Sequence, residues 1–351
     1  MCIGRYKTKV EFVYNKGNET VTYCFLNSTR TMDFKGIESY DSLACFIDEV
    51  VTPDTKYLKQ CKKTIDEVAE VLKSSQFKYS VMRTIKGGSI GKGTAVRDLS
   101  DVDLIFPIYD ITTVETLKQK MSGIKDAIHS LLSSKFRIKD STTTTWAYNT
   151  HILIDGDWQE VDIMPILNIT QDPSNLTNEE IKSIHTKMRK EAGSTERGYY
   201  NRCLRPLQTE FIGKHPEKIK RVIRLIKYWI KTNNHTIIKS IAVELLVIGA
   251  WEDLGKPHPG IPEEAIAKLV FDKLKNFGDI KLSWTDYYQP ADYSVPSKPY
   301  ILDPVDPYNN VISEITNHYH RGPNVPKADI AVMKQVDRLQ RDAERAFNSC
   351  K

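Results

Sequence analysis

Two acidic residues beside an apolar segment constrain the fold of this chain most. Asp101 and Asp103 stand two residues apart, and the apolar run of residues 104–106 follows them directly. Residues two apart in a β-strand point to the same face of the sheet. Two partly buried carboxylates on one face are unfavourable unless a cation neutralises them. The segment therefore predicts a strand whose acidic face binds a divalent cation, and Mg²⁺ suits such oxygen ligands.

A third carboxylate, Asp162, is expected in another strand. It lies between Val161 and Ile163, where a lone acid in an apolar strand would be costly. Three carboxylates on neighbouring strands would hold two Mg²⁺ ions about 3.5–4 Å apart, which is the arrangement for in-line phosphoryl displacement. We therefore predict Asp101, Asp103 and Asp162 as metal ligands and catalytic residues.

A glycine-rich turn, Gly87-Gly88-Ser89, precedes the acidic pair. Glycines let the backbone approach a polyphosphate, and Ser89 can donate its hydroxyl and its amide to the phosphates. Either motif alone is common in turns or strand edges. Together with Asp162, they predict a nucleotidyltransferase.

The pattern along the chain predicts a mixed α/β lobe followed by a helical lobe. Alternating apolar residues predict a β-hairpin within 9–26, and we expect residues 27–40 to form a linker. Further strands are expected at 80–85, 102–108, 144–154 and 158–166. The fold is therefore α+β, with an N-terminal β-hairpin extension (1–40), a nucleotidyltransferase lobe (41–175) and a mostly helical C-terminal lobe (176–351).

Apolar residues at helical spacing predict the faces by which the helices pack. The predicted buried faces are Leu58, Cys61, Ile65, Val68 and Leu72; Leu117, Met121, Ile124, Ile128 and Leu131; Ile219, Ile223, Ile226 and Ile230; and Val332, Val336, Leu339 and Ala343. Residues 240–254 and 262–277 are expected to be helical as well.

The net charge, the cysteines and the apolar runs of the sequence indicate which partners and which cellular compartment to expect. The formal net charge is +5, too small to indicate a nucleic-acid binder by itself. The six cysteines form no CxxC pair, which predicts free thiols and no zinc site. The first thirty residues are rich in charge, and no apolar run approaches the ~18 residues of a membrane span. We expect a monomer in the cytoplasm, with the nucleus as an alternative.

The residues around the predicted site closely resemble the 2′-5′-oligoadenylate synthetases, which share a polymerase-β-like nucleotidyltransferase fold with cyclic GMP-AMP synthase. The most specific matches are the Gly-Gly-Ser segment through the acidic pair, 86–105, and the Ile-Leu-Asp-Pro-Val-Asp-Pro run at 301–307. Weaker matches are residues 42–73, 160–165, 201–203, 225–229, 243–246 and 250–252.

The resemblance implies a template-independent enzyme that makes 2′-5′-linked oligoadenylates from ATP, with GTP as an alternative substrate. It also implies two Mg²⁺ ions, double-stranded RNA as the activator and a role in innate antiviral immunity. Gly88, Ser89, Lys227 and Ser240 would be nucleotide-binding positions. The helical-lobe signatures disfavour a poly(A) or CCA-adding polymerase.

Basic residues form two faces on the helix that follows Pro216. Lys220, Arg224, Lys227 and Lys231 form the face expected to reach the triphosphate. The outward residues Lys214, Lys218 and Arg221, together with Lys92, are the expected RNA contacts.

Two departures from the family keep alternatives open. Ile241 stands where the vertebrate synthetases have a tyrosine that stacks on a base, and Thr209 and Gly213 stand where basic RNA contacts are expected. A cyclic-dinucleotide synthase of the same fold therefore remains an alternative. A catalytically silent RNA-binding relative is the alternative of another class.

Overall fold

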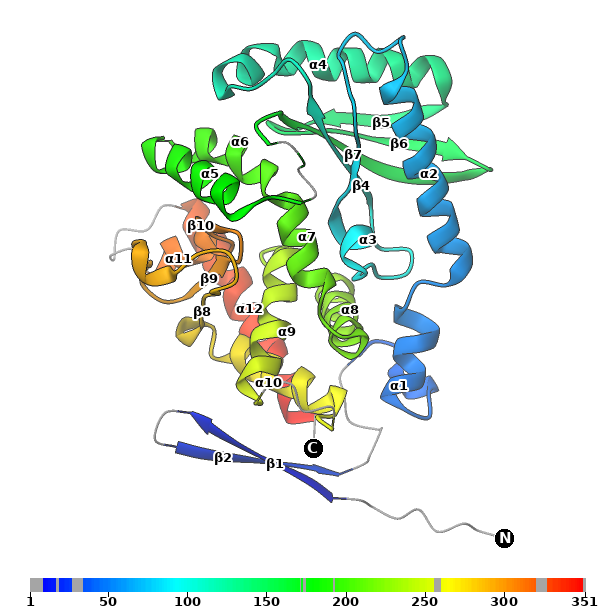
Figure 1. Cartoon of the computed structure of the whole chain (residues 1–351). Coiled ribbons are helices and arrows are strands. Elements are labelled where there is room, and N and C mark those ends of the chain that lie inside the picture. Colours follow the sequence, from blue (N-terminus) through cyan, green and yellow to red (C-terminus); the bar gives the residue numbers. More distant parts are fainter. Residues whose placement is uncertain are drawn as a thin grey trace.

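The chain forms a mixed α/β lobe stacked on a mostly helical lobe (Figure 1). The computed structural model describes residues 9–16, 19–26, 34–170, 172, 175–191, 193–255, 260–319 and 327–349. In this part of the chain no helix has the length and apolar character needed to cross a membrane. Cys45, Cys61 and Cys203 are free thiols, as predicted for them.

A five-stranded sheet forms the α/β lobe, in the order β3-β4-β7-β6-β5. The strands are β3 (Ile85–Lys86), β4 (Val102–Ile108), β5 (Ile138–Thr143), β6 (Tyr148–Ile154) and β7 (Asp157–Leu167). The central strands β4 and β7 run parallel, and the other neighbours are antiparallel. A tight turn at Asp155 and Gly156, both with positive φ, joins β6 to β7.

Helices α2 (Thr55–Lys73) and α4 (Val114–Lys135) pack on the sheet and form the core of this lobe. Each begins at a polar cap, because the Asp54 carboxylate accepts from Tyr57 N and the Thr113 hydroxyl accepts from Thr116 N. The predicted face of α4 is buried throughout, and so is that of α2 except for its first residue. Leu58 is 44% exposed, because it lies in the first turn of α2.

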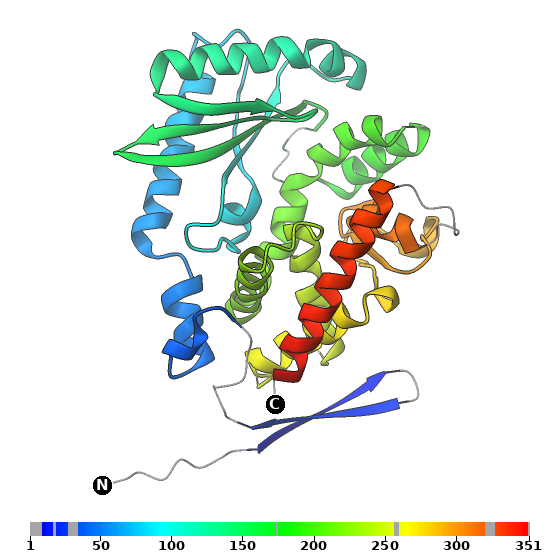
Figure 2. The ribbon, with the colours of Figure 1, turned by 180° about the vertical axis from the view of Figure 1, so that it is seen from behind.

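Between the sheet and the helical lobe, α3 (Gly88–Lys92) is a short helix. The helices of the lobe below are α5 (Asn178–Lys190), α6 (Ser194–Cys203), α7 (Arg205–Gly213), α8 (Glu217–Thr232), α9 (Ser240–Asp253), α10 (Glu263–Lys275), α11 (Ser313–Tyr319) and α12 (Lys327–Ser349). Figure 2 shows α12 running along the back of this lobe. The predicted apolar faces of α8 and α12 are buried, with Val332 only partly so.

A small sheet completes the helical lobe, with the order β10-β9-β8. Its strands are β8 (Lys281–Leu282), β9 (Tyr300–Asp303) and β10 (Asp306–Asn310), so the 301–307 run forms a buried turn between two strands. The pattern of apolar residues did not predict these strands, because each has at most five residues, too few to show a clear alternation of apolar and polar residues.

The hairpin predicted within 9–26 is confirmed: β1 (Lys9–Lys16) pairs antiparallel with β2 (Glu19–Leu26). The predicted linker at 27–40 lies partly outside the described residues, namely at 27–33. Its remainder carries Phe34 and Ile37, which are buried with Phe46 in the core of the helical lobe. Helix α1 (Leu43–Phe46) and the π-helical turn Ile47–Val51 continue this packing, so the segment before α2 joins the helical core rather than the sheet.

Three local predictions need correction. The strand expected at 80–85 is reduced to Ile85–Lys86, and the strand expected at 144–154 begins at Tyr148. The glycine-rich turn is helical at Gly88–Lys92. Strand β5 was also missed, because most of its side chains are exposed and polar and lack alternation.

Candidate active site

The predicted aspartates come from the two central strands of the sheet. Strands β4 and β7 are parallel, and Asp103 pairs with Asp162 in their register. Asp101 directly precedes β4 and is half-buried like the other two. The antiparallel neighbour β6 places Asn149 opposite Asp162 on the other side. The strands therefore bring the three carboxylates into one region of the sheet.

The glycine-rich segment lies directly against the acidic pair. Gly87 N–H donates to the Asp103 carbonyl at 3.0 Å. Gly88 has a φ of +54°, and a Cβ there would stand 1.6 Å from Asp103 Oδ2. Only glycine fits this position, because any side chain would strain the backbone and displace the carboxylate. Ser89 follows at once in α3, and its carbonyl accepts from Thr94 N at 2.9 Å.

The acidic cluster carries charge that nothing fully compensates. Burial, and then the charges of Asp162 and Asp101, raise the pKa of Asp103 to about 6, although Arg205 and Lys92 oppose them. Burial also raises the pKa of Asp162, and the hydrogen bond from the Asn149 amide opposes that rise. Carboxylates that repel one another in this way are the electrostatic pattern expected of a cation site.

Glu160 is an acidic neighbour that the sequence analysis did not single out. Burial and then the charge of Asp101 raise its pKa, and His151 opposes the rise. Because Glu160 stands two residues before Asp162 on β7, period-two alternation places both on the same face. The two-residue spacing of Glu160 and Asp162 in the sequence could therefore have predicted that Glu160 belongs to the acidic cluster.

A cavity of about 690 Å³ opens beside the acidic cluster. Its lining includes Asp101, Glu160, Tyr57 and Lys231. Tyr57 Oη donates to the Ser100 carbonyl at 2.6 Å, which fixes the start of β4 against α2.

The aspartates are neighbours, but they are not assembled into a metal cage. Over the ranges that the structure describes, no group of three or more His, Cys, Asp or Glu side chains is placed to hold a metal ion. Asp162 is instead hydrogen-bonded by Asn149 from β6. The assignment of Asp101, Asp103 and Asp162 as metal ligands therefore stays a prediction.

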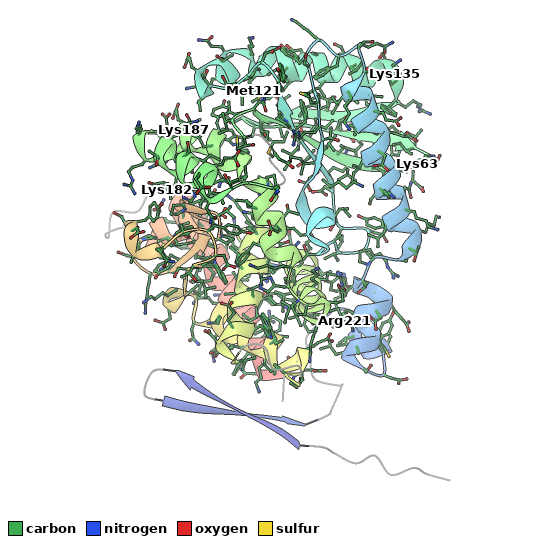
Figure 3. The ribbon with its side chains drawn as sticks, viewed as in Figure 1. Lys63, Met121, Lys135, Lys182, Lys187 and Arg221 are labelled. Carbon is green, nitrogen blue, oxygen red and sulfur yellow. The ribbon has the colours of Figure 1, made fainter. Side chains whose placement is uncertain are left out.

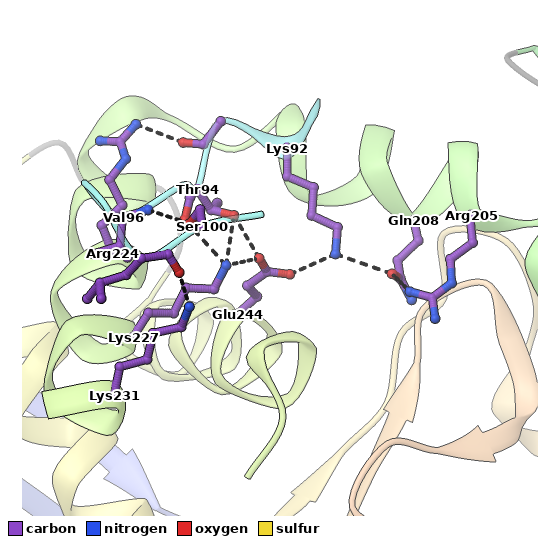
Figure 4. Close-up of polar contacts among 12 residues, drawn as sticks. Lys92, Thr94, Val96, Ser100, Arg205, Gln208, Arg224, Lys227, Lys231 and Glu244 are labelled. Atoms are coloured by element: carbon purple, nitrogen blue, oxygen red, sulfur yellow. Dashed lines mark hydrogen bonds and ion pairs between the residues drawn. The ribbon is translucent and has the colours of Figure 1, made fainter. Parts of the chain in front are cut away.

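Lys227 lies in a buried network between the lobes, as Figure 4 shows. Its Nζ is 2.6 Å from Glu244 Oε1, and Lys92 Nζ is 2.9 Å from Glu244 Oε2. Thr94 donates its hydroxyl to the same carboxylate at 2.7 Å. Burial alone would raise the pKa of Glu244, but the two lysines overcome it and lower the pKa to about 2. Burial in turn lowers the pKa of Lys227, and Glu244 opposes that shift.

The network bears on two predicted contacts, that of Lys227 with the triphosphate and that of Lys92 with RNA. Lys227 is only 3% exposed and Glu244 only 1%, so neither is open to solvent in this arrangement. Lys92, predicted to contact RNA, is also buried between the lobes. Their roles toward triphosphate and RNA stay predictions, and both would require the lobe contact to rearrange.

The rest of the first basic face binds the loop that precedes β4. Arg224 donates to the Gly93 carbonyl at 2.7 Å, and Lys231 donates to the Leu99 carbonyl. Lys220 lies beside Gly93. This face of α8 therefore joins the two lobes.

The outward basic residues lie in the helical lobe. Lys214 is exposed and pairs with Asp286. Arg221, labelled in Figure 3, pairs with Asp48 of the π-helical turn and with Glu263 at the start of α10. Lys218 is half-buried in the same helix. Ser240 is exposed at the start of α9. The structure thus leaves their predicted contacts with RNA or nucleotide untested.

Comparison with known proteins connects this geometry to a family. Residues 178–324 match the family described as 2′-5′-oligoadenylate synthetase 1, domain 2, C-terminus. The chain is 29% identical to 2′-5′-oligoadenylate synthase 1A of Rattus norvegicus over 300 residues, covering 76% of this chain and 82% of the relative. It is 27% identical to the Mus musculus 1A protein, covering 76% and 80%. A Mus musculus relative named inactive 2′-5′-oligoadenylate synthase 1B is 25% identical, covering 74% and 76%.

Solved structures show the same fold. The chain is similar to E. coli MS115-1 CdnC in complex with HORMA-deltaN, with a TM-score of 0.54 and 19% identity, covering 88% of this chain and 96% of CdnC. It is also similar to the Cid1 poly(U) polymerase, with a TM-score of 0.52 and 14% identity, covering 86% and 93%. The predicted polymerase-β-like nucleotidyltransferase fold and the resemblance to the oligoadenylate synthases are therefore confirmed.

Proposed function

We propose that this chain, a nucleotidyltransferase similar to the 2′-5′-oligoadenylate synthases, joins ATP into 2′-5′-linked oligoadenylates without a template and responds to double-stranded RNA. The observation that carries the proposal is the contact of Gly88 with Asp103, beside Asp162 on the paired strand. This contact joins the phosphate-binding and acidic motifs in a chain whose relatives bear the synthase name. We further propose a cytoplasmic role in antiviral defence.

The residues present suit divalent cations. All the expected donors are carboxylate oxygens, which Mg²⁺ prefers. Burial, and then repulsion from Asp162 and Asp101, raise the pKa of Asp103, and a bound cation would relieve that repulsion. Asp101, Asp103 and Asp162 would hold the two ions. When bound, the ions would supply charge neutralisation for the triphosphate and a lower pKa for the attacking hydroxyl.

The protein's own groups position the reactants. The backbone at Gly88 and the hydroxyl of Ser89 orient the donor phosphates, because no side chain at Gly88 intervenes. Asp162 accepts the proton of the acceptor's 2′-hydroxyl. Catalysis then consists mainly of positioning and charge complementarity.

Activation by RNA is proposed to assemble this site. Two contacts support the proposal: Asn149 holds the Asp162 carboxylate, and Glu244 holds Lys227 away from solvent. A duplex that bound more tightly to a state in which both side chains have left these partners would favour that state. Lys227 would then be available to the donor triphosphate.

A cyclic-dinucleotide synthase is the second candidate. Ile241 favours it, because this residue packs partly buried against the helical core and offers no aromatic ring to a base. A catalytically silent relative is the third candidate, because the chain is also similar to a protein named inactive 2′-5′-oligoadenylate synthase 1B.

One set of incubations separates the three candidates. The purified chain is incubated with ATP, GTP or both, with Mg²⁺, and with duplex RNA, duplex DNA or no nucleic acid. Chromatography before and after phosphatase treatment then identifies the products. We expect an RNA-dependent ladder from ATP whose members lose their terminal phosphates to phosphatase. A single phosphatase-resistant product would indicate a cyclic dinucleotide, and no product under any condition would indicate a silent relative.

A further inference from the structure

Two arginines at the junction of α6 and α7 hold buried nitrogen atoms that lack a partner among the described residues. Nε of Arg202 and Nε of Arg205 are both buried without a hydrogen bond. Their Nη1 atoms do have acceptors: Arg202 donates to the Gly198 carbonyl at 3.0 Å, and Arg205 donates to Gln208 Oε1 at 3.1 Å. An unsatisfied buried donor is costly, more so on a charged group. The pair therefore lacks the acceptors that its chemistry demands.

The two charges also repel each other. Burial, and then the charge of Arg205, lower the pKa of Arg202 to about 9, and Tyr199 and Asp306 offset this only in part. Two guanidiniums placed together in a poorly solvated region favour an anion between or beside them.

Aromatic packing fixes the orientation of Arg202. Its Cζ lies 3.9 Å from the centroid of the Trp146 ring, and Trp146 packs edge-on against Tyr199 at 4.7 Å. A Cβ at Gly198 would stand 2.7 Å from Trp146, so glycine makes room for the ring. The guanidinium is thus held in one plane, which lowers the entropy lost when it binds a ligand.

A buried carboxylate fixes the orientation of Arg205 through an amide. Asp303 Oδ2 accepts from Gln208 Nε2 at 2.9 Å, which turns Gln208 Oε1 toward two cations. Figure 4 shows Lys92 reaching that oxygen, at 3.3 Å, with Arg205 beside it. The charges of Arg205 and Lys92 both act on Asp103. Arg205 therefore lies within electrostatic range of the acidic cluster, and Arg202 precedes it by three residues at the junction of α6 and α7.

Lys92 and Arg205 differ in one respect that decides what each can bind. Lys92 is compensated by Glu244 at 2.9 Å. Within the described part of the chain, Arg205 has a neutral amide oxygen for its Nη1 and no acceptor for its Nε. An incoming anion would meet two arginines bonded, over the described ranges, only to neutral oxygens, and a lysine already bound to a carboxylate.

We infer that Arg202 and Arg205 form an anion subsite that binds the phosphate chain of a nucleoside triphosphate beside Asp103. A guanidinium offers parallel donors that match phosphate oxygens, and two of them suit a polyphosphate. The inference rests on the proposed function for the identity of the substrate. The subsite itself follows from the contacts of the two side chains.

Binding of inorganic tripolyphosphate in EDTA tests the subsite without catalysis. Isothermal titration is carried out on the full chain, on Arg202→Gln, Arg205→Gln and the double variant, and on Arg189→Gln. Arg189 is a matched control, because this exposed residue of α5 contacts Tyr308 and Tyr293 away from the pair. Each site variant should bind about 10-fold more weakly, and the double variant ~100-fold, whereas Arg189→Gln should bind like the parent.

Thermal unfolding of each variant accompanies the titration. Removing one of two repelling buried charges should leave the midpoint unchanged or raise it, so lost binding would not reflect lost folding. Arg205→Lys supplies a second check: it keeps the charge but loses the fork, and its affinity should fall between those of the parent and Arg205→Gln. Tripolyphosphate affinity within twofold of the parent in the folded double variant would overturn the subsite.

The source of the phosphate chain and the proposed function are tested separately. Titrations with ATP and with adenosine, also in EDTA, should show that only ATP loses affinity in the double variant. An equal loss for adenosine would overturn the assignment to phosphate. If the parent chain makes no nucleotide product while tripolyphosphate binding still depends on both arginines, the proposed function fails and the subsite stands. If the chain forms product but tripolyphosphate binding does not depend on the arginines, the subsite fails and the proposed function stands.

Discussion

Two clusters of buried charge meet at the lobe junction, and they differ in how their charge is compensated. Around Asp103 the carboxylates repel one another, and the pKa of Asp103 rises to about 6. Around Glu244 one carboxylate lies between Lys227 and Lys92, and its pKa falls to about 2. Lys92 belongs to both environments.

The difference distinguishes a binding site from a structural contact. In a compensated cluster the opposite charges stabilise one another. Removing one member leaves its partners buried without an opposite charge, which lowers the stability of the fold. An uncompensated cluster stores repulsion that a ligand of opposite charge relieves. By this criterion Arg202 and Arg205 can bind a ligand in the arrangement described, whereas Lys227 must first leave Glu244.

Asp103→Asn gives the largest expected effect. It should reduce nucleotidyl transfer ~10³-fold or more, because charge stabilisation by a bound cation is worth several kcal/mol and each ~1.4 kcal/mol is tenfold in rate. The free energy of unfolding should stay unchanged or rise, since repulsion with Asp162 and Asp101 is removed. Initial rates and urea unfolding measure the two quantities. Near-normal product formation would remove Asp103 from the site.

Glu244→Gln should have the opposite signature on stability. It leaves Lys227 and Lys92 buried without an anion, which should cost ~3 kcal/mol in the free energy of unfolding. Glu314→Gln is the control, because its pair with Lys239 is 2.9 Å long but exposed, and its loss should cost less than ~1 kcal/mol. Equal effects in urea unfolding would show that the Glu244 cluster is no more structural than a surface pair.

Gly88→Ala tests whether the glycine contact positions the acidic cluster. The new Cβ would meet Asp103 Oδ2 at 1.6 Å, so the carboxylate must move. We expect transfer to fall roughly 10²-fold, because small misplacements of reacting groups have costs of this order. Gly156→Ala is matched in positive φ but has open space around it, so it should lose ~1 kcal/mol of stability and keep its activity. Parallel activity losses in both variants would attribute the effect to backbone strain alone.

Asp306→Asn extends the comparison to a buried carboxylate whose side-chain hydrogen bond comes from the neutral amide of Asn201. Burial and then the charge of Asp303 raise the pKa of Asp306 to about 7, although Tyr308 N, Asn201 and Arg197 oppose the rise. Between pH ~4 and 7 the unfolded chain is therefore ionised while the folded chain keeps the proton. Stability should fall as pH rises through this window, by ~2 kcal/mol between pH 5.5 and 7. Glu244, with its depressed pKa, contributes in the opposite sense, and its stabilisation is lost as pH falls from ~4.5 toward 2.

The measurement is urea unfolding as a function of pH. In Asp306→Asn the fall between pH 5.5 and 7 should flatten, because no proton is bound there. A variant that retains the parent slope would assign the pH dependence to another group.

Much of the acidic site was predictable from the sequence, because local periodicity carries it. Alternation in strands fixes the face of Asp101 and Asp103, and β4 forms at the predicted residues. The same alternation would have identified Glu160.

The compensated network was less predictable, because its partners are distant in the sequence. Lys92 and Glu244 are separated by 152 residues, and their contact depends on how the two lobes stack. One signal was available, since Glu244 is a lone acid inside the apolar run of α9. The unpaired state of Arg202 and Arg205 has no local signature at all, because it depends on which acceptors the fold fails to supply.

The smallest expected effect concerns the outer surface, where charge is compensated but exposed. Lys214 pairs with Asp286 at the surface, so Lys214→Gln should change stability by less than ~1 kcal/mol. If Lys214 contacts an RNA phosphate, the slope of log affinity against log salt should fall by ~0.9. Lys118→Gln, which breaks an exposed pair between α4 and Glu196, should leave the slope unchanged. Duplex RNA titrations at several salt concentrations decide the point, and an unchanged slope in Lys214→Gln would restrict this lysine to its pair with Asp286.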